Sequence, residues 1–488
     1  MFRAMSAAAV NDRDVGGRWE LAVLGALVVA AAVLRLHYLG EPMRFDEAYT
    51  FYAYATQTVG HIVSTYDGPN NHILYSLLVH GSWRVFGDHV WVVRLPAFIA
   101  GVAIVPVAYL VGRALYDRRS GLWAAALTAV FAPLVDYSVN GRGYTVGVLL
   151  VLVGLWLGVR FLANPRPVMW ALVVLAFALS MYAVPTMAYG VATVGVWLVS
   201  VLVVRPPPRR IRVVLAVIAA VGVSALLAWL LYPSGFGHRA TGLANELSTH
   251  RSGIRIVATR VWGNWNRAAP HPLDWIVLIG FLAGLVLHRR IARQTVPIAA
   301  AAVVVLGGIV LFAPISPLIR SWLYLLPLYL ITAAAGISWA AGRVLARFGP
   351  RLVALGSAGA AACVAVGLGI ALLATGMRTA EARPASDNDL VALLHRYVHP
   401  GEHALLDIHV RVPAIYYVHR FGGGGLTGTA VGPAEIRAGH VVVVVARFAG
   451  TPVSPIDLVR TAGGRPGGPA RLLVRRPWID FYDVPLSR

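Results

Sequence analysis

The chain has 488 residues, of which 58% are hydrophobic and 13% are charged, and its mean hydropathy is +0.69. This composition excludes an ordinary soluble fold and indicates an all-α polytopic membrane protein. The net charge of +21 comes from arginine, because the chain contains no lysine, and arginines that face anionic membrane lipids account for it without nucleic-acid binding.

The apolar runs predict the membrane helices. A helix needs about 17 to 25 apolar residues to cross a bilayer, and about eleven segments meet this length. They are residues 20–39, 91–113, 121–139, 143–162, 168–184, 187–204, 211–232, 272–288, 295–313, 321–342 and 352–374. The first run exceeds the roughly 7 to 15 apolar residues of a signal peptide and lacks a small-residue cleavage site, so we expect it to remain as a helix.

Arginine placement indicates the orientation. With residues 1–19 as a cytoplasmic tail, the arginines between helices gather in the inner connections, and only Arg142 and Arg320 fall in short outer loops. This bias predicts an inner amino terminus and an outer carboxyl terminus. Residues 72–86 are apolar but reach only about 22 Å as a helix, and counting them as a span would reverse the bias. We therefore expect residues 40–90 to form an external loop of amphipathic or re-entrant helices.

The predicted transmembrane module, residues 20–375, contains a second large external loop at residues 233–271. Residues 376–488 are polar, glycine-rich and proline-containing, and their alternating patterns predict a small extracytoplasmic α/β domain. Its helices are expected at residues 387–398, 413–419 and 455–461, and its strands at residues 404–408, 441–445 and 471–474. The glycine run at residues 422–425 lacks the strand-to-helix context of a nucleotide site, so we expect a loop there.

The single cysteine, Cys363, lies in the last predicted membrane helix. No disulfide within the chain is therefore expected, and a thiol or zinc site lacks ligands. No Walker sequence occurs, so ATP is not expected as the energy source. Chemistry at the outer face must then use an already activated substrate.

Five short blocks, taken in order, resemble the membrane glycosyltransferases of family 39, the protein O-mannosyltransferase and aminoarabinose-transferase relatives of the GT-C fold. They are residues 44–49, 69–75, 83–87, 93–96 and 137–144, and residues 320–327 are similar to the family's arginine-tyrosine-proline segment. The resemblance implies transfer of a sugar from a polyprenyl-phosphate donor to a cell-envelope glycan, lipid or protein. The resemblance places this reaction at the outer face of the plasma membrane. Separately, the use of arginine without lysine is typical of a GC-rich bacterium.

Asp46 and Glu47 lie just after the first predicted helix, where the chain leaves the membrane. An acceptor hydroxyl is a poor nucleophile, so a carboxylate within hydrogen-bonding reach is useful as a general base. The resemblance implies that Asp46 is the catalytic aspartate. Glu47 is expected to hold the sugar or acceptor, to support Asp46, or to join it at a divalent cation, Mg²⁺, Mn²⁺ or Ca²⁺, because hard cations prefer oxygen ligands. A solvated pair of loop acids is the simpler alternative.

Arg142 and Arg320 are the candidates for binding the donor phosphate. The phosphate gains negative charge as the glycosidic bond breaks, and guanidinium groups stabilise such charge through bidentate contacts. Tyr144 and Tyr324 are expected to assist by hydrogen bonding. The alternatives are helix-end arginines that reach the headgroups and tyrosines that lie at the interface for reasons of solvation.

Asn70, Asn71 and His72 are candidates for binding the sugar or acceptor, because amides and a neutral imidazole both donate and accept hydrogen bonds. The same residues also suit a cap before a helix. His238 and Arg239, in the second large external loop, are further candidates for contact with the acceptor. A loop packed on the membrane surface is the alternative for these two.

Asn140 stands where many relatives have a glutamate before the arginine, so the family's second acidic position is open. Asp136, one helical turn earlier, is expected either to replace that acid or to be a buried residue paired within the bundle.

Three other functions stay open. A lipid-linked-sugar transporter or flippase would also be polytopic, but it is expected to carry ionisable residues within its spans and to show internal repeats, and we find neither pattern. A lipid-phosphate hydrolase needs a nucleophile with a base, and no such pairing stands out. A catalytically inactive relative would keep the fold without turnover.

Overall fold

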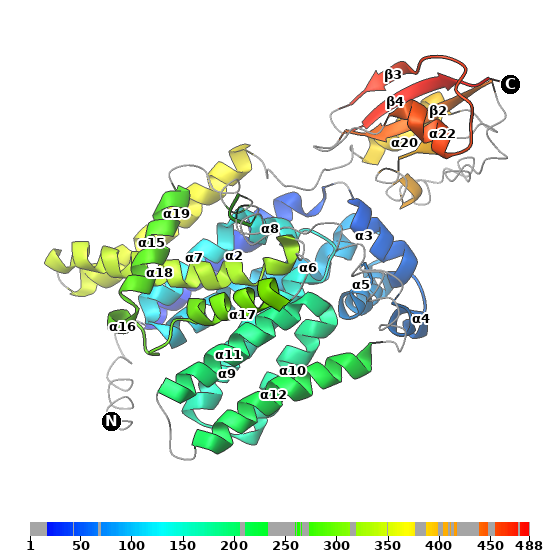
Figure 1. Ribbon diagram of the computed structural model, residues 1–488. Helices are drawn as coiled ribbons and strands as arrows, with labels where there is room; N and C mark the ends of the chain where they lie inside the picture. Colours follow the sequence, from blue (N-terminus) through cyan, green and yellow to red (C-terminus); the bar gives the residue numbers. More distant parts are fainter. Residues whose placement is uncertain are drawn as a thin grey trace.

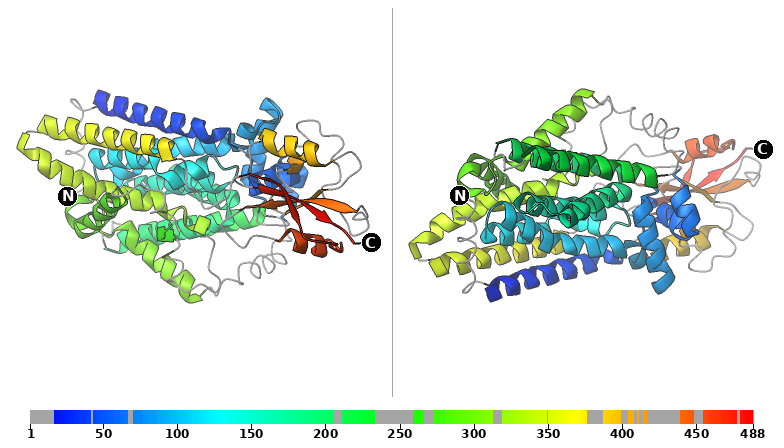
Figure 2. Two further views of the ribbon diagram at one scale, coloured as in Figure 1. Left: turned by 90° about the horizontal axis from the view of Figure 1, so that it is seen from above. Right: turned by 90° about the horizontal axis from the view of Figure 1, so that it is seen from below.

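The computed structural model shows a helical bundle with a small unit that contains a β-sheet beyond one end (Figure 1). The sheet lies at the end of the bundle that carries residues 43–86, as both views of Figure 2 show. The structure describes residues 17–41, 43–66, 70–204, 210–232, 259, 261–263, 265, 273–312, 319–348, 350–375, 387–398, 404–407, 410, 414–416, 439–447, 454–476 and 479–487.

Seven helices of the described chain are long and apolar enough to cross a membrane. They are α2 (Gly17–Leu39), α6 (Val90–Leu115), α9 (Tyr144–Ala163), α11 (Ala188–Val204) with the preceding η2 (Pro185–Met187), α12 (Arg210–Leu231), α18 (Leu325–Leu345) and α19 (Pro350–Thr375). The bent pair α7 (Arg118–Val130) and α8 (Ala132–Ser138) is an eighth candidate. Three shorter apolar helices are α10 (Pro167–Ala183), α15 (Leu273–Val286) and α17 (Ile298–Phe312).

Each apolar run predicted from the sequence falls on one of these helices, and the run at residues 121–139 is divided between α7 and α8. The chain is therefore a helical, multi-pass membrane protein. Helices α10, α15 and α17 have only 17, 14 and 15 residues, whereas about 20 are needed to span the hydrocarbon core upright. The full set of eleven spans and the inner amino terminus thus stay predictions.

Helices α7 and α8 meet at Phe131 with a bend of 60°. Pro133, in the first turn of α8, has no N–H to donate to the carbonyl group of Ala129, four residues earlier. Arg35 of α2 supplies the donor instead, because its guanidinium group donates to the carbonyl oxygens of Ala129 at 2.7 Å and Thr128 at 3.4 Å. This buried contact stabilises the broken end of α7 and holds the direction in which α8 leaves it.

The segment that the sequence predicts to be the first external loop is a series of short helices. They are α3 (Phe45–Thr50), the π-helix η1 (Phe51–Ala55), α4 (Val59–Ser64) and α5 (Ile73–Phe86). The 14 residues of α5 reach about 21 Å, which is too short to cross the membrane, as the sequence predicted. The remaining short helices of the bundle are α16 (His288–Ile291), η3 (Ile319–Trp322) and η4 (Ala346–Phe348).

The C-terminal unit contains a four-stranded sheet with the strand order β1-β2-β4-β3. Its elements are α20 (Asp387–Tyr397), β1 (Ala404–Leu406), β2 (His440–Ala446), α22 (Pro455–Thr461), β3 (Arg471–Arg475) and β4 (Ile479–Pro485). β1 pairs with β2 in parallel, and the other neighbours are antiparallel. Sequence patterns missed β4, because Asp480 and Asp483 interrupt its apolar alternation. Of the helix expected at residues 413–419, residues 414–416 are described, and they are helical.

Tyr416 connects this unit with η1. Its ring packs edge-on against Phe51 and Tyr52, with centroid distances of 5.6 Å and 6.4 Å. The same hydrophobic cluster includes Ala48 of α3 and Phe481 of β4. The C-terminal unit therefore packs on the chain that directly follows Asp46 and Glu47.

Candidate active site

One oxygen of Asp46 accepts hydrogen bonds from two arginines that are distant in the sequence. Arg142 Nη1 and Arg320 Nη1 both donate to Oδ2 of Asp46, the second at 3.4 Å. The ring of Tyr144 lies beside both guanidinium groups, with centroid distances of 5.4 Å to Arg142 and 5.9 Å to Arg320. Four of the predicted site residues thus meet in one group, which we call the Asp46 cluster.

Three different parts of the fold contribute to the Asp46 cluster. Asp46 lies in the first turn of α3, Arg142 lies in the turn between α8 and α9, and Arg320 lies in η3. The side chain of Arg142 is buried, whereas those of Asp46 and Arg320 are 22% and 21% exposed. The cluster is therefore rigidly held on the Arg142 side and accessible on the other.

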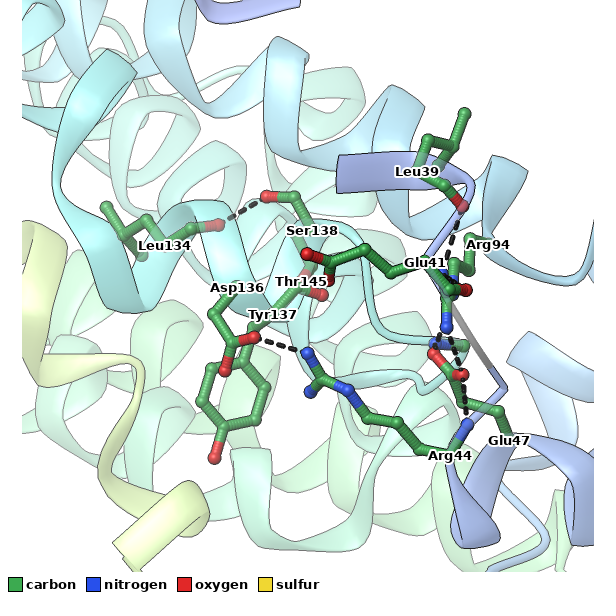
Figure 3. Close-up of polar contacts among 11 residues, drawn as sticks. Leu39, Glu41, Arg44, Glu47, Arg94, Leu134, Asp136, Tyr137, Ser138 and Thr145 are labelled. Atoms are coloured by element: carbon green, nitrogen blue, oxygen red, sulfur yellow. Dashed lines mark hydrogen bonds and ion pairs between the residues drawn. The ribbon is translucent and has the colours of Figure 1, made fainter. Parts of the chain in front are cut away.

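Glu47 is fully buried and forms two hydrogen bonds with Arg94 of α6 (Figure 3). Arg94 Nε donates to Oε1 at 2.9 Å, and Nη2 donates to Oε2 at 2.6 Å. The backbone N–H groups of Gly141 and Arg44 donate to the same two oxygens, at 2.6 Å and 2.9 Å. Burial alone raises the pKa of Glu47, but the charges of Arg94 and Arg44 and their hydrogen bonds outweigh it and lower this pKa below 4.5. Glu47 is therefore a carboxylate that joins α3, α6 and the turn at Gly141.

A second buried ion pair lies beside the first. Arg44 Nη2 donates to Oδ1 of Asp136 at 2.5 Å, which connects the start of α3 with α8 (Figure 3). Asp136 is therefore paired within the bundle, which is one of the two roles that the sequence allowed. Arg94 also donates from Nη1 to the carbonyl oxygens of Leu39 at 3.0 Å and Glu41 at 2.6 Å, so it caps the end of α2.

Arg35, Arg44 and Arg94 have no role predicted from the sequence, yet all three side chains are buried. A signal was present, because an arginine inside an apolar run is costly in a membrane unless it is paired. Arg35 lies within α2 and Arg94 within α6. Each lies four positions from the nearer end of its helix, Leu39 in α2 and Val90 in α6, and is held there by the hydrogen bonds described above.

Asn70 and Asn71 are neighbours in the sequence with different surroundings. Oδ1 of Asn70 accepts a hydrogen bond from Arg142 Nη2 at 2.9 Å, so this side chain belongs to the edge of the Asp46 cluster. Asn71 is buried, and its Nδ2 donates to the carbonyl oxygens of Ile62 at 3.1 Å and Thr65 at 2.6 Å. These contacts connect the end of α4 with the start of α5, so Asn71 joins the two helices, while no side chain of the described residues caps the start of α5.

His72 contacts the other side of the Arg142 turn. The backbone N–H of Gly143 donates to Nδ1 of His72 at 2.9 Å, and the imidazole packs edge-on against Tyr144 at 5.1 Å. Burial, together with the charges of Arg142 and Arg320, lowers the pKa of His72 well below its ordinary value of 6.5. His72 is therefore neutral at pH 7 and accepts a hydrogen bond at Nδ1.

Tyr324 is buried in the helical core, where its hydroxyl group shares a hydrogen bond with Thr193 at 3.3 Å. Its ring lies close to Gly190 of α11, because a Cβ at Gly190 would lie 3.2 Å from this ring. These contacts suit a packing residue. The predicted acceptor contacts at His238 and Arg239 lie outside the described residues.

Asp46 and Glu47 do not fit a divalent-cation site. Each oxygen of Glu47 accepts a hydrogen bond from Arg94, and Asp46 accepts from Arg142 and Arg320. A cation between the two carboxylates would lie among three guanidinium groups that repel it. In the part of the chain that is described, no group of three or more histidine, cysteine, aspartate or glutamate residues could hold a metal ion.

The family model described as dolichyl-phosphate-mannose-protein mannosyltransferase matches residues 68–231. None of the curated proteins is similar in sequence to the chain. Among solved structures, ArnT from Cupriavidus metallidurans is similar both in the apo state and bound to undecaprenyl phosphate. Each comparison has a TM-score of 0.57 and 13% identity, and covers 94% of this chain and 97% of ArnT. The oligosaccharyltransferase from Archaeoglobus fulgidus, in complex with Zn and sulfate, is less similar, with a TM-score of 0.49 and 13% identity. This comparison covers 86% of this chain and 67% of the oligosaccharyltransferase.

The matched segment includes Asn70, Arg94, Arg142 and Tyr144. The structural likeness to ArnT extends over nearly the whole chain, and it shows a common fold. Residues 68–231 are therefore similar to the dolichyl-phosphate-mannose-protein mannosyltransferase family, and the chain has the multi-pass helical fold of ArnT.

Proposed function

We propose that the protein moves a sugar from a polyprenyl-phosphate donor onto a hydroxyl group of a cell-envelope acceptor, at the outer face of the plasma membrane. The observation that carries this proposal is the meeting of one carboxylate and two guanidinium groups, from Asp46, Arg142 and Arg320. The structure of ArnT with undecaprenyl phosphate supports a donor of the same chemical class, because this chain has the same fold.

Arg142 and Arg320 bind the donor phosphate in this mechanism. Negative charge on the phosphate oxygens increases as the bond to the sugar breaks, and two fixed guanidinium groups stabilise it. Nε of Arg142 is buried and has no hydrogen-bond partner among the described residues, so a phosphate oxygen would supply one. Tyr144 packs on both guanidinium groups and keeps them side by side.

Asp46 acts as the general base. The proton of the acceptor hydroxyl moves to Asp46 while the acceptor oxygen bonds to the anomeric carbon. The bond between that carbon and the phosphate oxygen breaks, and polyprenyl phosphate leaves. Oδ2 of Asp46 accepts from Arg142 and Arg320, whereas Oδ1 accepts no hydrogen bond from the described part of the chain. Oδ1 is therefore the oxygen that the acceptor can reach.

Donor binding releases Asp46 from the arginines in this proposal. Arg142 and Arg320 both donate to Oδ2 of Asp46, so these N–H groups are already engaged by the carboxylate. A phosphate group competes for the same N–H donors. Asp46 then becomes available to the acceptor, so we expect the donor to bind before the acceptor.

Glu47 and His72 position Arg142. Glu47 accepts from the N–H of Gly141, and His72 accepts from the N–H of Gly143. Both glycines that flank Arg142 are thus held by buried side chains, and such supporting contacts orient the group that touches the ligand. In this proposal neither Glu47 nor His72 contacts the sugar. Asn70, at the edge of the cluster, orients the guanidinium group of Arg142.

The experiment that tests the proposal uses the purified full-length protein in liposomes, with a panel of polyprenyl-phosphate sugars and cell-envelope acceptors. The readouts are labelled sugar on the acceptor and released polyprenyl phosphate. Asp46→Asn is expected to lower kcat by about 10²-fold or more with little effect on donor binding. Arg142→Gln is expected to weaken binding of the donor as well. Asp457→Asn, at an exposed acid of α22, is the matched control and should keep the wild-type rate.

Three outcomes would contradict the proposed roles of Asp46, of the two arginines or of the protein as a transferase. Unchanged transfer by Asp46→Asn would exclude Asp46 as the base. Donor affinity that is the same in Arg142→Gln and in the wild type would exclude the arginines as the phosphate site. Movement of labelled donor across the bilayer, with no transfer to any acceptor, would favour a transporter.

A further inference from the structure

A pocket of about 550 Å³ lies at the end of α7 and α18 that is distant from Asp46. Helix α18 begins shortly after Arg320, and five of its residues line the pocket, namely Ala335, Ser338, Trp339, Gly342 and Arg343. The 21 residues of α18 extend about 30 Å. Helix α7 begins in the pocket and leads through α8 toward Arg142. The pocket is therefore separate from the proposed active site.

The pocket combines cations with an apolar wall. Its lining includes Arg119, Ser120, Ile291, Ser338, Trp339 and Arg343. The guanidinium group of Arg343 lies over the ring of Trp339, at 5.2 Å from the centroid. Arg119 is 38% exposed and forms only a loose pair with Asp117 at 3.8 Å. Gly342 leaves room for Arg119, because a Cβ there would lie 3.1 Å from its Nη1.

The charges in the pocket favour an anion. Asp117 already accepts a hydrogen bond from the N–H of Ser120 at 2.7 Å, as the N-cap of α7. Arg343 packs on Trp339 and has no carboxylate partner within the described ranges. The positive end of the α7 dipole also faces this region. The positive groups at the pocket are thus two guanidinium groups and a helix N-terminus, whereas the negative group is one carboxylate that already accepts a hydrogen bond.

We propose that this pocket binds the phosphate headgroup of an anionic phospholipid, with Arg119 and Arg343 as its cationic ligands. Helix α18 is long and apolar enough to cross the membrane, so its end lies at the depth of the headgroups. Basic pockets between membrane helices suit such headgroups, and the apolar side chains of Ile291 and Ala335 offer a surface to the acyl chains. This site is independent of sugar transfer.

The chain offers a matched control for the test. Arg160 lies over Trp156 at 4.3 Å, near the end of α9, in the same four-residue spacing as Arg343 and Trp339 but outside the pocket. The purified full-length protein is incubated with phosphatidylglycerol or phosphatidylcholine in detergent, and the retained lipid is measured by native mass spectrometry. The double variant Arg119→Gln/Arg343→Gln is expected to retain phosphatidylglycerol at least about tenfold more weakly than the wild type. Arg160→Gln should retain it like the wild type.

Phosphatidylcholine, which has no net negative charge, should be retained equally by the wild type, the double variant and Arg160→Gln. Equal retention of phosphatidylglycerol by the double variant and the wild type would overturn the proposal. So would an equal loss in Arg160→Gln, or displacement of the lipid by inorganic phosphate at the same concentration. If the double variant elutes as aggregate in size-exclusion chromatography, Arg343→Gln alone replaces it, with the same expected weakening and the same overturning result.

Discussion

The backbone N–H of Gly141 donates a 2.6 Å hydrogen bond to the carboxylate of Glu47. These two residues are the sequence neighbours of Arg142 and Asp46, which form the ion pair of the proposed site. The buried contact thus holds the turn that carries Arg142 against the helix that carries Asp46. Because Glu47 also pairs with Arg94, the geometry of the site depends on α6 as well.

Glu47→Gln is predicted to destabilise the whole protein. The substitution leaves the buried guanidinium group of Arg94 without its charged partner, and breaking such a pair costs about 3 to 5 kcal/mol. The midpoint of thermal unfolding in detergent should fall clearly, and sugar transfer should fall with it. Asp457→Asn, which breaks an exposed pair with Arg460, should leave the midpoint nearly unchanged. A Glu47→Gln protein that unfolds at the wild-type midpoint would contradict this prediction.

Asn70→Ala and Asn71→Ala are predicted to change different properties, namely donor binding and stability. Asn71→Ala removes buried hydrogen bonds to the carbonyl groups of Ile62 and Thr65, so the free energy of unfolding should fall by about 1 to 3 kcal/mol. Asn70→Ala removes a contact with Arg142 and should raise KM for the donor with little loss of stability. Thermal unfolding and donor titration of both variants check this. The reverse pattern would place Asn71 in the binding site.

The helices and the members of the Asp46 cluster could be predicted from the sequence because their signals are local. An apolar run of sufficient length indicates a membrane helix wherever it lies in the chain. The short blocks around Asp46 and Arg142 are equally visible in the sequence, and so is Arg320, which lies in a short loop that is predicted to be external. Their meeting in one cluster then follows from helices that return to the same end of the bundle.

The contacts that hold the cluster could not be predicted, because they join distant parts of the chain. Glu47 and Arg94 are 47 residues apart, and Arg44 and Asp136 are 92 residues apart. A carboxylate that binds a sugar and one that binds a buried arginine look the same in a sequence. Only the number of donors around Glu47 distinguishes a supporting role from direct contact with a substrate.

His72 is predicted to make stability dependent on pH. Its pKa in the folded protein lies well below 6.5, so the unfolded chain binds a proton that the folded protein excludes. Stability should therefore fall as the pH drops below about 6.5, by up to about 1.4 kcal/mol per pH unit, until the folded pKa is reached. His72→Asn keeps an acceptor for Gly143 but does not titrate. Thermal unfolding of both proteins between roughly pH 7 and pH 5 should show a difference that changes with pH, and a constant difference would contradict the prediction.

Gly143→Ala is predicted to disrupt the site through space and not through backbone conformation. The φ angle of Gly143 is −69°, which any residue adopts, but a Cβ there would lie 2.6 Å from the carbonyl oxygen of Ala183. The turn must then move away from α10 and carry Arg142 and the contact with His72 with it. A misplacement of about 1 Å can cost roughly 10²-fold in rate, so transfer by Gly143→Ala should fall by this order.

Gly81→Ala in α5 is the matched control for Gly143→Ala. A Cβ at Gly81 would meet no atom within 4 Å, and alanine is favoured over glycine in a helix by about 0.5 to 1 kcal/mol. This variant should keep the wild-type rate and gain slightly in stability. If Gly143→Ala also keeps the wild-type rate, then the turn between α8 and α9 tolerates movement. Arg142 would then not need the support of Glu47 and His72 on either side to bind a phosphate.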